Sequence, residues 1–176
     1  MTGKGNISMN YLRREFDENG LLLAGYQAEL FEKSVEHCDC SSLIFLRRFL
    51  KSEHLKKLDK NESFLLSLNV WEGLEEIEAQ FGKSEYGSEK YSPDVMFWMG
   101  YIFRYISYTR RINTNIIFAA FTPQELNKKY YVYHTQDPEW VIERLLEGAG
   151  LDESFFDSNE RLKKLLREAY KKRKTA

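Results

Sequence analysis

The sequence predicts a mainly α-helical protein, a compact multi-helix domain around a central buried helix at about 93–111, with at most a minor hairpin. The three prolines are the first observation behind this prediction. Each follows a residue that can cap a helix, and proline suits the first helical position because its missing N–H would have no helical partner there. The three pairs are Ser92-Pro93, Thr122-Pro123 and Asp137-Pro138.

The second observation is the spacing of the capping box, in which a cap residue and a Glu or Gln three positions later exchange hydrogen bonds with each other's backbone. Thr122 and Glu125 have this spacing. Two variants of the motif are Asn69 with Glu72 and Asp157 with Glu160. So many helix starts in one chain are hard to reconcile with a sheet protein.

The sequence determines its first elements least well. Residues 1–9 are polar, and we expect them to form a flexible N-terminus. Asn19-Gly20 is a turn signal between Tyr11–Phe16 and Leu21–Ala24, so these two segments form either a small hairpin or a helix end. Farther along, Ile116–Phe121 is short enough to be a strand as well as a helix.

From residue 24 onward, helical periodicity and cap residues place the elements in order. We expect helices near 24–37, 42–50, 53–59, 70–81, 93–111, 114–120, 123–131, 138–148 and 158–173. Ser41 and Ser52 are the expected caps of the second and third helices. Gly82 and Gly148 stand where helices are expected to end, and 82–91 is expected to be a surface loop.

The segment at 93–111 is the expected hub because apolar residues cover most of its sides. One stripe at helical spacing is Val95, Met99, Ile102 and Ile106, and a second, aromatic stripe is Phe97, Tyr101, Tyr105 and Tyr108. Gly100 lies in its middle and costs about 1 kcal/mol of helix propensity relative to Ala. A close helix–helix crossing at Gly100 would offset that cost.

Length and charge narrow the class of protein. The 176 residues suit one helical domain at 10–147 and a helical extension at 148–176 with a basic tail. The 26 Lys and Arg against 27 Asp and Glu argue against binding nucleic acid through overall charge. No apolar run is long enough to span a membrane, and residues 1–9 lack the apolar core of a signal peptide. We therefore expect a soluble, cytoplasmic protein that contacts no membrane.

Motifs that carry chemistry are weak in this chain. His37-Cys38-Asp39-Cys40 lacks the second ligand pair of a zinc site, so these cysteines are expected to be reduced thiols at a helix end. Gly3-Lys4-Gly5 does not lie between a strand and a helix, as a phosphate loop does. The sequence therefore names no catalytic residue, no metal site and no cofactor. An enzyme of unknown reaction, with His134 or a Glu as its base, remains a third hypothesis.

The densest polar-aromatic stretch is Tyr130–Pro138, just before a capped helix. Tyr and His combine an apolar body with a polar tip, which suits an interface or a pocket rim. Arginines of the hub helix are expected to face this stretch. The candidate partner-binding residues are Arg104, Tyr108, Tyr131 and His134. Two alternatives stay open: a buried tyrosine and arginine network that fixes the helix angles, or a ligand pocket.

A nucleic-acid-binding regulator, with DNA as its partner, is the alternative function. The candidate phosphate contacts are Arg47, Arg48, Lys171, Lys172 and Arg173. The simpler interpretation of the basic tail is that cations in the last turn complement the helix dipole.

Several strings of the sequence resemble one family when they are taken together. They are Phe16–Leu21, Ala24–Glu32, Phe45–Phe49, Trp98–Tyr105 and Tyr133–Pro138. They resemble a small bacterial family found mainly in Firmicutes, labelled antitoxin-like and associated with ADP-ribosyltransferase-type toxin loci. The resemblance covers about 10–147 and implies a non-enzymatic interaction protein. Such a protein would be the antitoxin-like component of a toxin–antitoxin or stress locus, which binds and neutralises a cognate toxin-like protein.

Overall fold

The fold is all-helical throughout the part of the chain that the structure, a computed structural model, describes: residues 13–61, 67, 69–157, 167 and 170–171. The elements are α1 (Glu18–His37), α2 (Ser42–Lys51), α3 (Glu53–Asp59), α4 (Val70–Phe81), α5 (Pro93–Arg110), α6 (Thr114–Ala120), α7 (Pro123–Tyr133), α8 (Pro138–Gly148) and the short 3-10 helix η2 (Glu153–Phe156). The predicted mainly-α fold is confirmed. Most of the helix expected at 158–173, including Glu160, lies outside the described residues.

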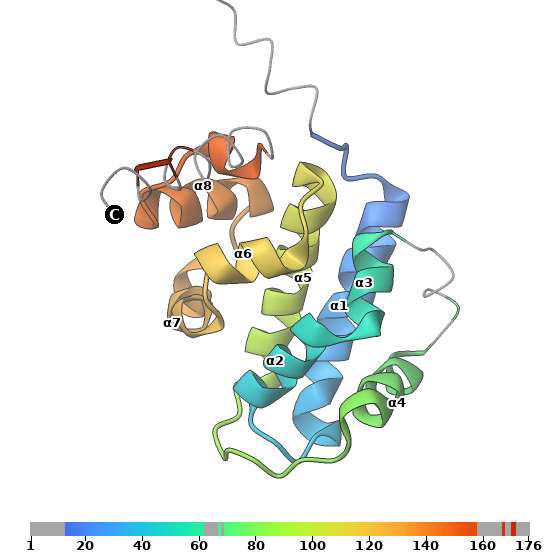
Figure 1. Ribbon diagram of the computed structural model, residues 1–176. Coiled ribbons are helices and arrows are strands. Elements are labelled where there is room, and N and C mark those ends of the chain that lie inside the picture. The colour runs from blue at the N-terminus through green and yellow to red at the C-terminus, as the bar shows by residue number, and fades with distance from the viewer. Residues whose placement is uncertain (1–12, 62–66, 68, 158–166, 168–169, 172–176) are drawn as a thin grey trace, which may run out of the picture.

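Helices α1 and α5 form the centre of the molecule and lie side by side (Figure 1). They run antiparallel, since the Arg14 N–H just before α1 donates to the carbonyl oxygen of Thr109 near the end of α5 (2.7 Å). At the crossing, a Cβ on Gly100 would lie 2.7 Å from the carbonyl oxygen of Gln27 and 2.8 Å from Cα of Ala28. Gly100 therefore permits the close helix–helix crossing that the sequence predicts, and α5 is the buried hub.

The other helices cover this pair from two directions. Helices α2, α3 and α4 lie on one side, and α6, α7 and α8 on the other (Figure 1). Aromatic side chains fill the space between them: Phe31 packs edge-on against Phe49 of α2, and Phe103 stacks on Phe118 of α6 with ring centroids 3.7 Å apart. No helix in the described residues is long and apolar enough to cross a membrane.

Helix ends follow the predicted caps. Both capping boxes whose residues are described form, at Asn69 with Glu72 and at Thr122 with Glu125. The side chains of Ser41, Ser52, Ser92 and Asp137 also accept the expected backbone hydrogen bonds. Gly82 ends α4 with φ at 78°, a left-handed conformation that favours glycine.

The start of α1 decides between the two alternatives that the sequence left open. Residues from Glu18 onward are helical, so no hairpin turns at Asn19-Gly20. Asp17 caps the helix by accepting from the Gly20 N–H (2.9 Å), and a Cβ on Gly20 would lie 2.7 Å from the Tyr108 ring. The glycine is needed for close packing between helices rather than for a turn.

Of two later segments, one confirms the helix expected at 114–120 and the other extends the helix expected at 123–131. The strand alternative for Ile116–Phe121 is wrong, because residues 114–120 form α6. Helix α7 continues past 131 to Tyr133, which places Tyr131 within the helix and His134 at its C-terminal cap. After α8, Glu153 of η2 accepts from Arg110 of α5 (3.0 Å), so residues up to 156 pack on the helical body.

Candidate functional site

One face of the N-terminal half of α5 is rich in aromatic side chains. Asp94, Phe97, Trp98 and Tyr101 have the spacing i, i+3, i+4 and i+7, which places them on one side of a helix. The capped N-terminus of α5 fixes this face, because Ser92 accepts the hydrogen bond of the Val95 N–H. Phe97 is 41% exposed, whereas Trp98 is largely buried behind it.

Helix α7 supplies the facing wall of the site. Tyr130 and His134 are one turn apart and stack with ring centroids 4.4 Å apart. Tyr130 also meets Trp98 edge-on at 5.8 Å, which joins α7 to α5. Nδ1 of His134 lies 2.8 Å from the carbonyl oxygen of Tyr130, and because a carbonyl only accepts, Nδ1 carries the proton.

Together with Glu32 of α1, these residues line an open hollow of about 480 Å³, hereafter the aromatic groove. Its lining is Glu32, Asp94, Phe97, Trp98, Tyr101, Tyr130 and His134. This volume falls within the range of roughly 300–1,000 Å³ that is typical of ligand sites. The antiparallel packing of α1 on α5 brings Glu32 to the same end as Asp94, although 62 positions separate them in sequence.

Negative charge characterises the aromatic groove. Two carboxylates line it, and no Lys or Arg stands among its described lining residues. Burial raises the pKa of the Tyr130 hydroxyl, and the nearby charge of Asp94 raises it further. Burial alone raises the pKa of Tyr101. Both phenols therefore stay protonated and neutral around pH 7.

Exposed side chains extend the surface beyond the groove. Tyr131 is 84% exposed, and its ring centroid lies 5.5 Å from that of the groove residue Tyr130 on α7. Aromatic residues are enriched in protein interfaces, and clustered exposed apolar groups mark such surfaces. The Nδ1–H of His134 donates to a backbone carbonyl, which leaves Nε2 as the acceptor of the ring.

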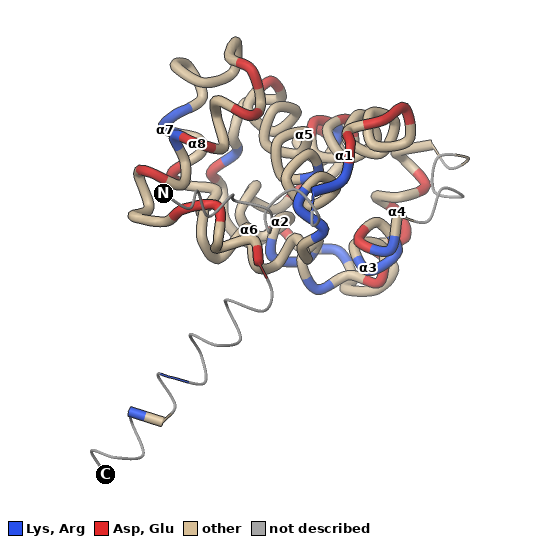
Figure 2. The backbone as a smooth tube through the Cα atoms, turned by 90° about the horizontal axis from the view of Figure 1, so that it is seen from above, with Lys and Arg blue, Asp and Glu red and all other residues tan. Residues whose placement is uncertain are grey.

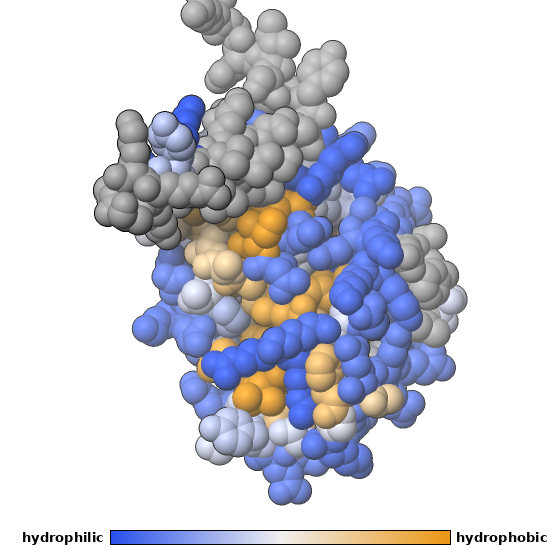
Figure 3. Space-filling view, viewed as in Figure 1, coloured by the Kyte–Doolittle hydropathy of each residue, from blue (hydrophilic) through white to orange (hydrophobic). Residues whose placement is uncertain are grey.

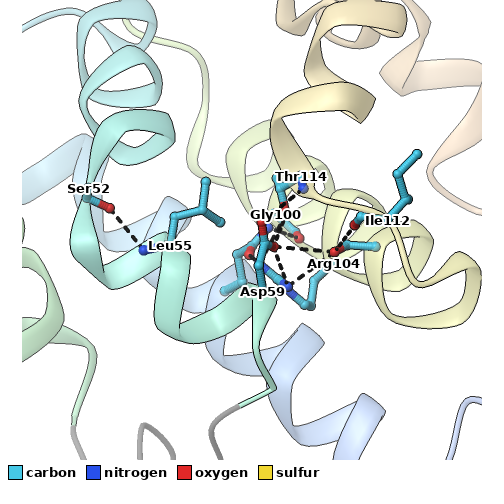
Figure 4. Close-up of polar contacts among 9 residues, drawn as sticks. Ser52, Leu55, Asp59, Gly100, Arg104, Ile112 and Thr114 are labelled. Atoms are coloured by element: carbon cyan, nitrogen blue, oxygen red, sulfur yellow. Dashed lines mark hydrogen bonds and ion pairs between the residues drawn. The ribbon is translucent and has the colours of Figure 1, made fainter. Parts of the chain in front are cut away.

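Arg104, a predicted partner-binding residue, is instead fully buried (Figure 4). Its guanidinium donates twice to Oε1 of Gln27, at 2.8 and 2.9 Å, and once to Asp59 at 3.0 Å. Ser107 and Thr114 accept the remaining bonds at 3.4 and 3.3 Å. Arg104 thus belongs to the buried network that the sequence left open as an alternative.

Tyr108 also lies in the core, at 1% exposure. Its hydroxyl donates to the cap residue Asp17 (2.6 Å), and the Arg14 guanidinium covers its ring at 4.4 Å. Tyr131 and His134 are exposed on α7. The structure therefore brings two of the four predicted residues to one surface and places the other two inside.

Sequence reasoning missed most of the aromatic groove. The spacing of Asp94, Phe97 and Tyr101 was a usable signal, because it marks one face of a helix. That face was assigned to the core because α5 is apolar on most sides. No local pattern connects Glu32 to this face, since their proximity depends on how α1 packs.

Three of the five candidate nucleic-acid contacts lie among the described residues: Arg47, Arg48 and Lys171. Arg47 is exposed, but Arg48 donates to the Gly82 carbonyl oxygen (2.5 Å) and covers the ring of Phe81. Figure 2 shows Lys and Arg along α2 and α3. Lys171 is exposed, and Lys172 and Arg173 lie outside the described residues.

A second hollow lies between α2 and α6, where Figure 3 shows a hydrophobic surface. It has a volume of about 270 Å³, and its lining includes Leu43, Leu46, Leu50 and Phe118, with Arg47 at its side. Its lining includes none of the aromatic residues of α7.

Cys38, His37 and His54 are held by burial or by hydrogen bonds within the fold. Burial raises the pKa of the Cys38 thiol to about 12, which leaves it protonated and a poor nucleophile. His37 contacts Glu78 (3.1 Å), and His54 is buried between Tyr26 and Glu76. Among the described residues, no group of three His, Cys, Asp or Glu side chains is arranged to hold a metal ion.

Comparisons with protein-family models, with curated proteins and with solved structures found no match to this chain.

Proposed function

We propose that this chain is a non-enzymatic interaction protein, an antitoxin-like component of a bacterial toxin–antitoxin or stress locus. It acts in the cytoplasm, where it binds and neutralises a cognate toxin-like protein. The aromatic groove and the adjoining exposed face of α7 form its partner-binding surface. The observation that carries this proposal is an exposed cluster of aromatic side chains around a cavity of about 480 Å³.

The composition of this surface suits binding to a protein. Interface hot spots are enriched in Tyr and Trp, and they lie in pockets that lose their water on binding. Phe97 and Tyr131 offer large exposed rings, while Trp98 and Tyr130 hold the floor and wall of the groove in place. A partner that covers this surface would bury aromatic area without having to refold α5.

The test uses the tagged full chain as bait, together with the double variant Tyr131→Ala/His134→Ala. A partner captured from the source cells is identified, purified, and its dissociation constant measured against both proteins. We expect the double variant to bind at least about 30-fold more weakly, which corresponds to a hot-spot loss of about 2 kcal/mol. Co-expression should show the same difference in the rescue of growth from the partner's toxicity.

Tyr86→Ala is the matched control, because Tyr86 is 74% exposed on the loop before α5 and does not line the groove. It should bind the partner as the parent does. Circular dichroism and thermal unfolding confirm that all variants fold. Unchanged affinity and rescue in a folded double variant would remove the partner-binding role of this surface.

A further inference from the structure

The proposal concerns what enters the aromatic groove, and it rests on the proposed partner-binding function. We propose that the groove receives an arginine side chain from a segment of the partner protein. The guanidinium stacks on the aromatic faces of α5 and α7 and pairs with Glu32 and Asp94. The partner's recognised segment is therefore basic at its central position.

Charge complementarity selects a cation over other ligands. Glu32 and Asp94 approach the groove from two helices, and the described lining contains no Lys or Arg to pair with them. Lys33 is 3.8 Å from Glu32, but both side chains are about one-third exposed, and such surface pairs contribute little. The two carboxylates would repel a phosphate or an acidic peptide.

The aromatic lining favours a cation that can also be desolvated. A cation over an aromatic face gains about 0.5–1 kcal/mol at an exposed site and about 2 kcal/mol when water is excluded. Phe97 and Tyr101 on α5 and Tyr130 on α7 provide such rings around one cavity. The raised pKa values of Tyr101 and Tyr130 keep both phenols neutral.

Arginine fits this site better than lysine. Its planar guanidinium stacks on a ring and donates in pairs to carboxylates, whereas the ammonium of lysine is a compact and strongly hydrated charge. The groove's volume of about 480 Å³ also exceeds what a single ion fills, so it admits a long side chain and part of its backbone.

The experiment titrates the ¹⁵N-labelled full chain with the blocked tripeptide acetyl-Gly-Arg-Gly-amide and follows the NMR signals. The reference is the same peptide with citrulline, which keeps the shape of arginine and removes its charge. We expect saturable shifts of the Trp98 indole N–H and of the Tyr130 and His134 backbone amides. The citrulline peptide should bind at least about tenfold more weakly, since it cannot form the ionic contacts.

Substitution of the carboxylates provides the second measurement. Glu32→Gln/Asp94→Asn keeps the shape of the groove and should weaken the arginine peptide at least about tenfold. Glu143→Gln, an exposed carboxylate on α8, is the matched control and should leave the titration unchanged. Equal binding of the citrulline peptide, or no shift at the groove, would overturn the inference. Groove signals that move with protein concentration alone would assign it to a second copy of the chain and overturn the inference too.

The same variants separate this inference from the proposed function. Partner affinity is measured with Glu32→Gln/Asp94→Asn and with Tyr131→Ala/His134→Ala. Both should weaken it if an arginine of the partner occupies the groove. Loss only in the Tyr131/His134 variant keeps the partner-binding surface and rejects the arginine. Normal affinity in both variants rejects the surface itself.

Discussion

Arg104 is the largest side chain that the described protein encloses completely. A buried guanidinium is tolerated only when its charge and its donors are matched. Its guanidinium donates five hydrogen bonds, which are accepted by Gln27, Asp59, Ser107 and Thr114. Gln27 in turn donates to the Gly100 carbonyl oxygen (3.0 Å), which joins the network to the helix crossing.

Replacing Arg104 with Met should therefore destabilise the fold strongly. Asp59 and Gln27 would keep their polar groups in the interior without the partner that matches them. We expect a loss of about 3–5 kcal/mol in the free energy of unfolding, measured by chemical denaturation.

The exposed Arg47→Met is the control for this substitution and should change stability by less than about 0.5 kcal/mol. Asp59→Asn combined with Arg104→Met should lose less than the two single losses added together, because they break the same pair. Equal stability of Arg104→Met and the parent would show that the network contributes nothing.

His54 should make the stability of the protein depend on pH. The ring lies between the Tyr26 hydroxyl (3.0 Å) and the Glu76 carboxylate (2.8 Å) and is fully buried. Burial lowers the pKa of His54 below its ordinary value of 6.5, and the hydrogen bond to Glu76 opposes part of this shift. The folded protein thus prefers the neutral ring, and the unfolded chain takes up the proton first.

The free energy of unfolding should consequently fall as the pH drops below 6.5, where His54 of the unfolded chain is protonated and the folded ring is still neutral. The fall should end once the pH is below the lowered pKa of the folded ring. His54→Gln should remove this decline while costing about 1–3 kcal/mol at pH 8, because it leaves buried polar partners poorly matched. Urea unfolding at several pH values measures both effects. His134→Gln, at an exposed histidine, should keep the parent's decline, and an identical decline in His54→Gln would contradict the assignment.

Among the helices, two glycines of the α1–α5 pair should respond in opposite ways to substitution by alanine. Gly100 lies at the crossing and Gly25 faces open space. Gly100→Ala would place a Cβ within 2.8 Å of the α1 backbone, so the helices must separate. Overpacking of this kind costs about 1–3 kcal/mol and outweighs the helix propensity that alanine adds. Gly25 on α1 has no atom within 4 Å of a built Cβ.

Gly25→Ala is therefore the matched control and should stabilise the protein by about 0.5–1 kcal/mol. Thermal unfolding of both variants gives the comparison. A stabilised Gly100→Ala protein would mean that the helices do not cross as closely as described.

Local signals predicted the elements well where their cause was local. Caps such as Ser92 and Thr122 bond to backbone within their own first turn, so the sequence alone placed the starts of α5 and α7. The sequence did not predict that α1 starts at Glu18, because Asn19-Gly20 resembles a turn. Gly20 is instead required by close packing against the ring of Tyr108, 88 positions away in sequence. A turn signal and a packing glycine look identical in one sequence.

At the scale of the whole molecule, chain topology assembles the candidate site. The antiparallel pair of α1 and α5 sets Glu32 beside Asp94, and α7 returns to add Tyr130 and His134. The sequence predicted two residues of this region as partner-binding: His134, which lines the groove, and Tyr131, which adjoins it. Arg104 was placed with them because helical spacing does not tell a buried arginine from an exposed one.

Site-specific photo-crosslinking in the source cells shows whether a partner contacts the α7 side of the aromatic groove. The photoreactive residue p-benzoylphenylalanine replaces Tyr131 in one protein and Tyr86 in a second, which are 84% and 74% exposed in the parent chain. We expect one dominant cross-linked partner from position 131 and no cross-link to that partner from position 86. Cross-linking of that partner from position 86 but not from 131 would contradict the assignment of the binding surface.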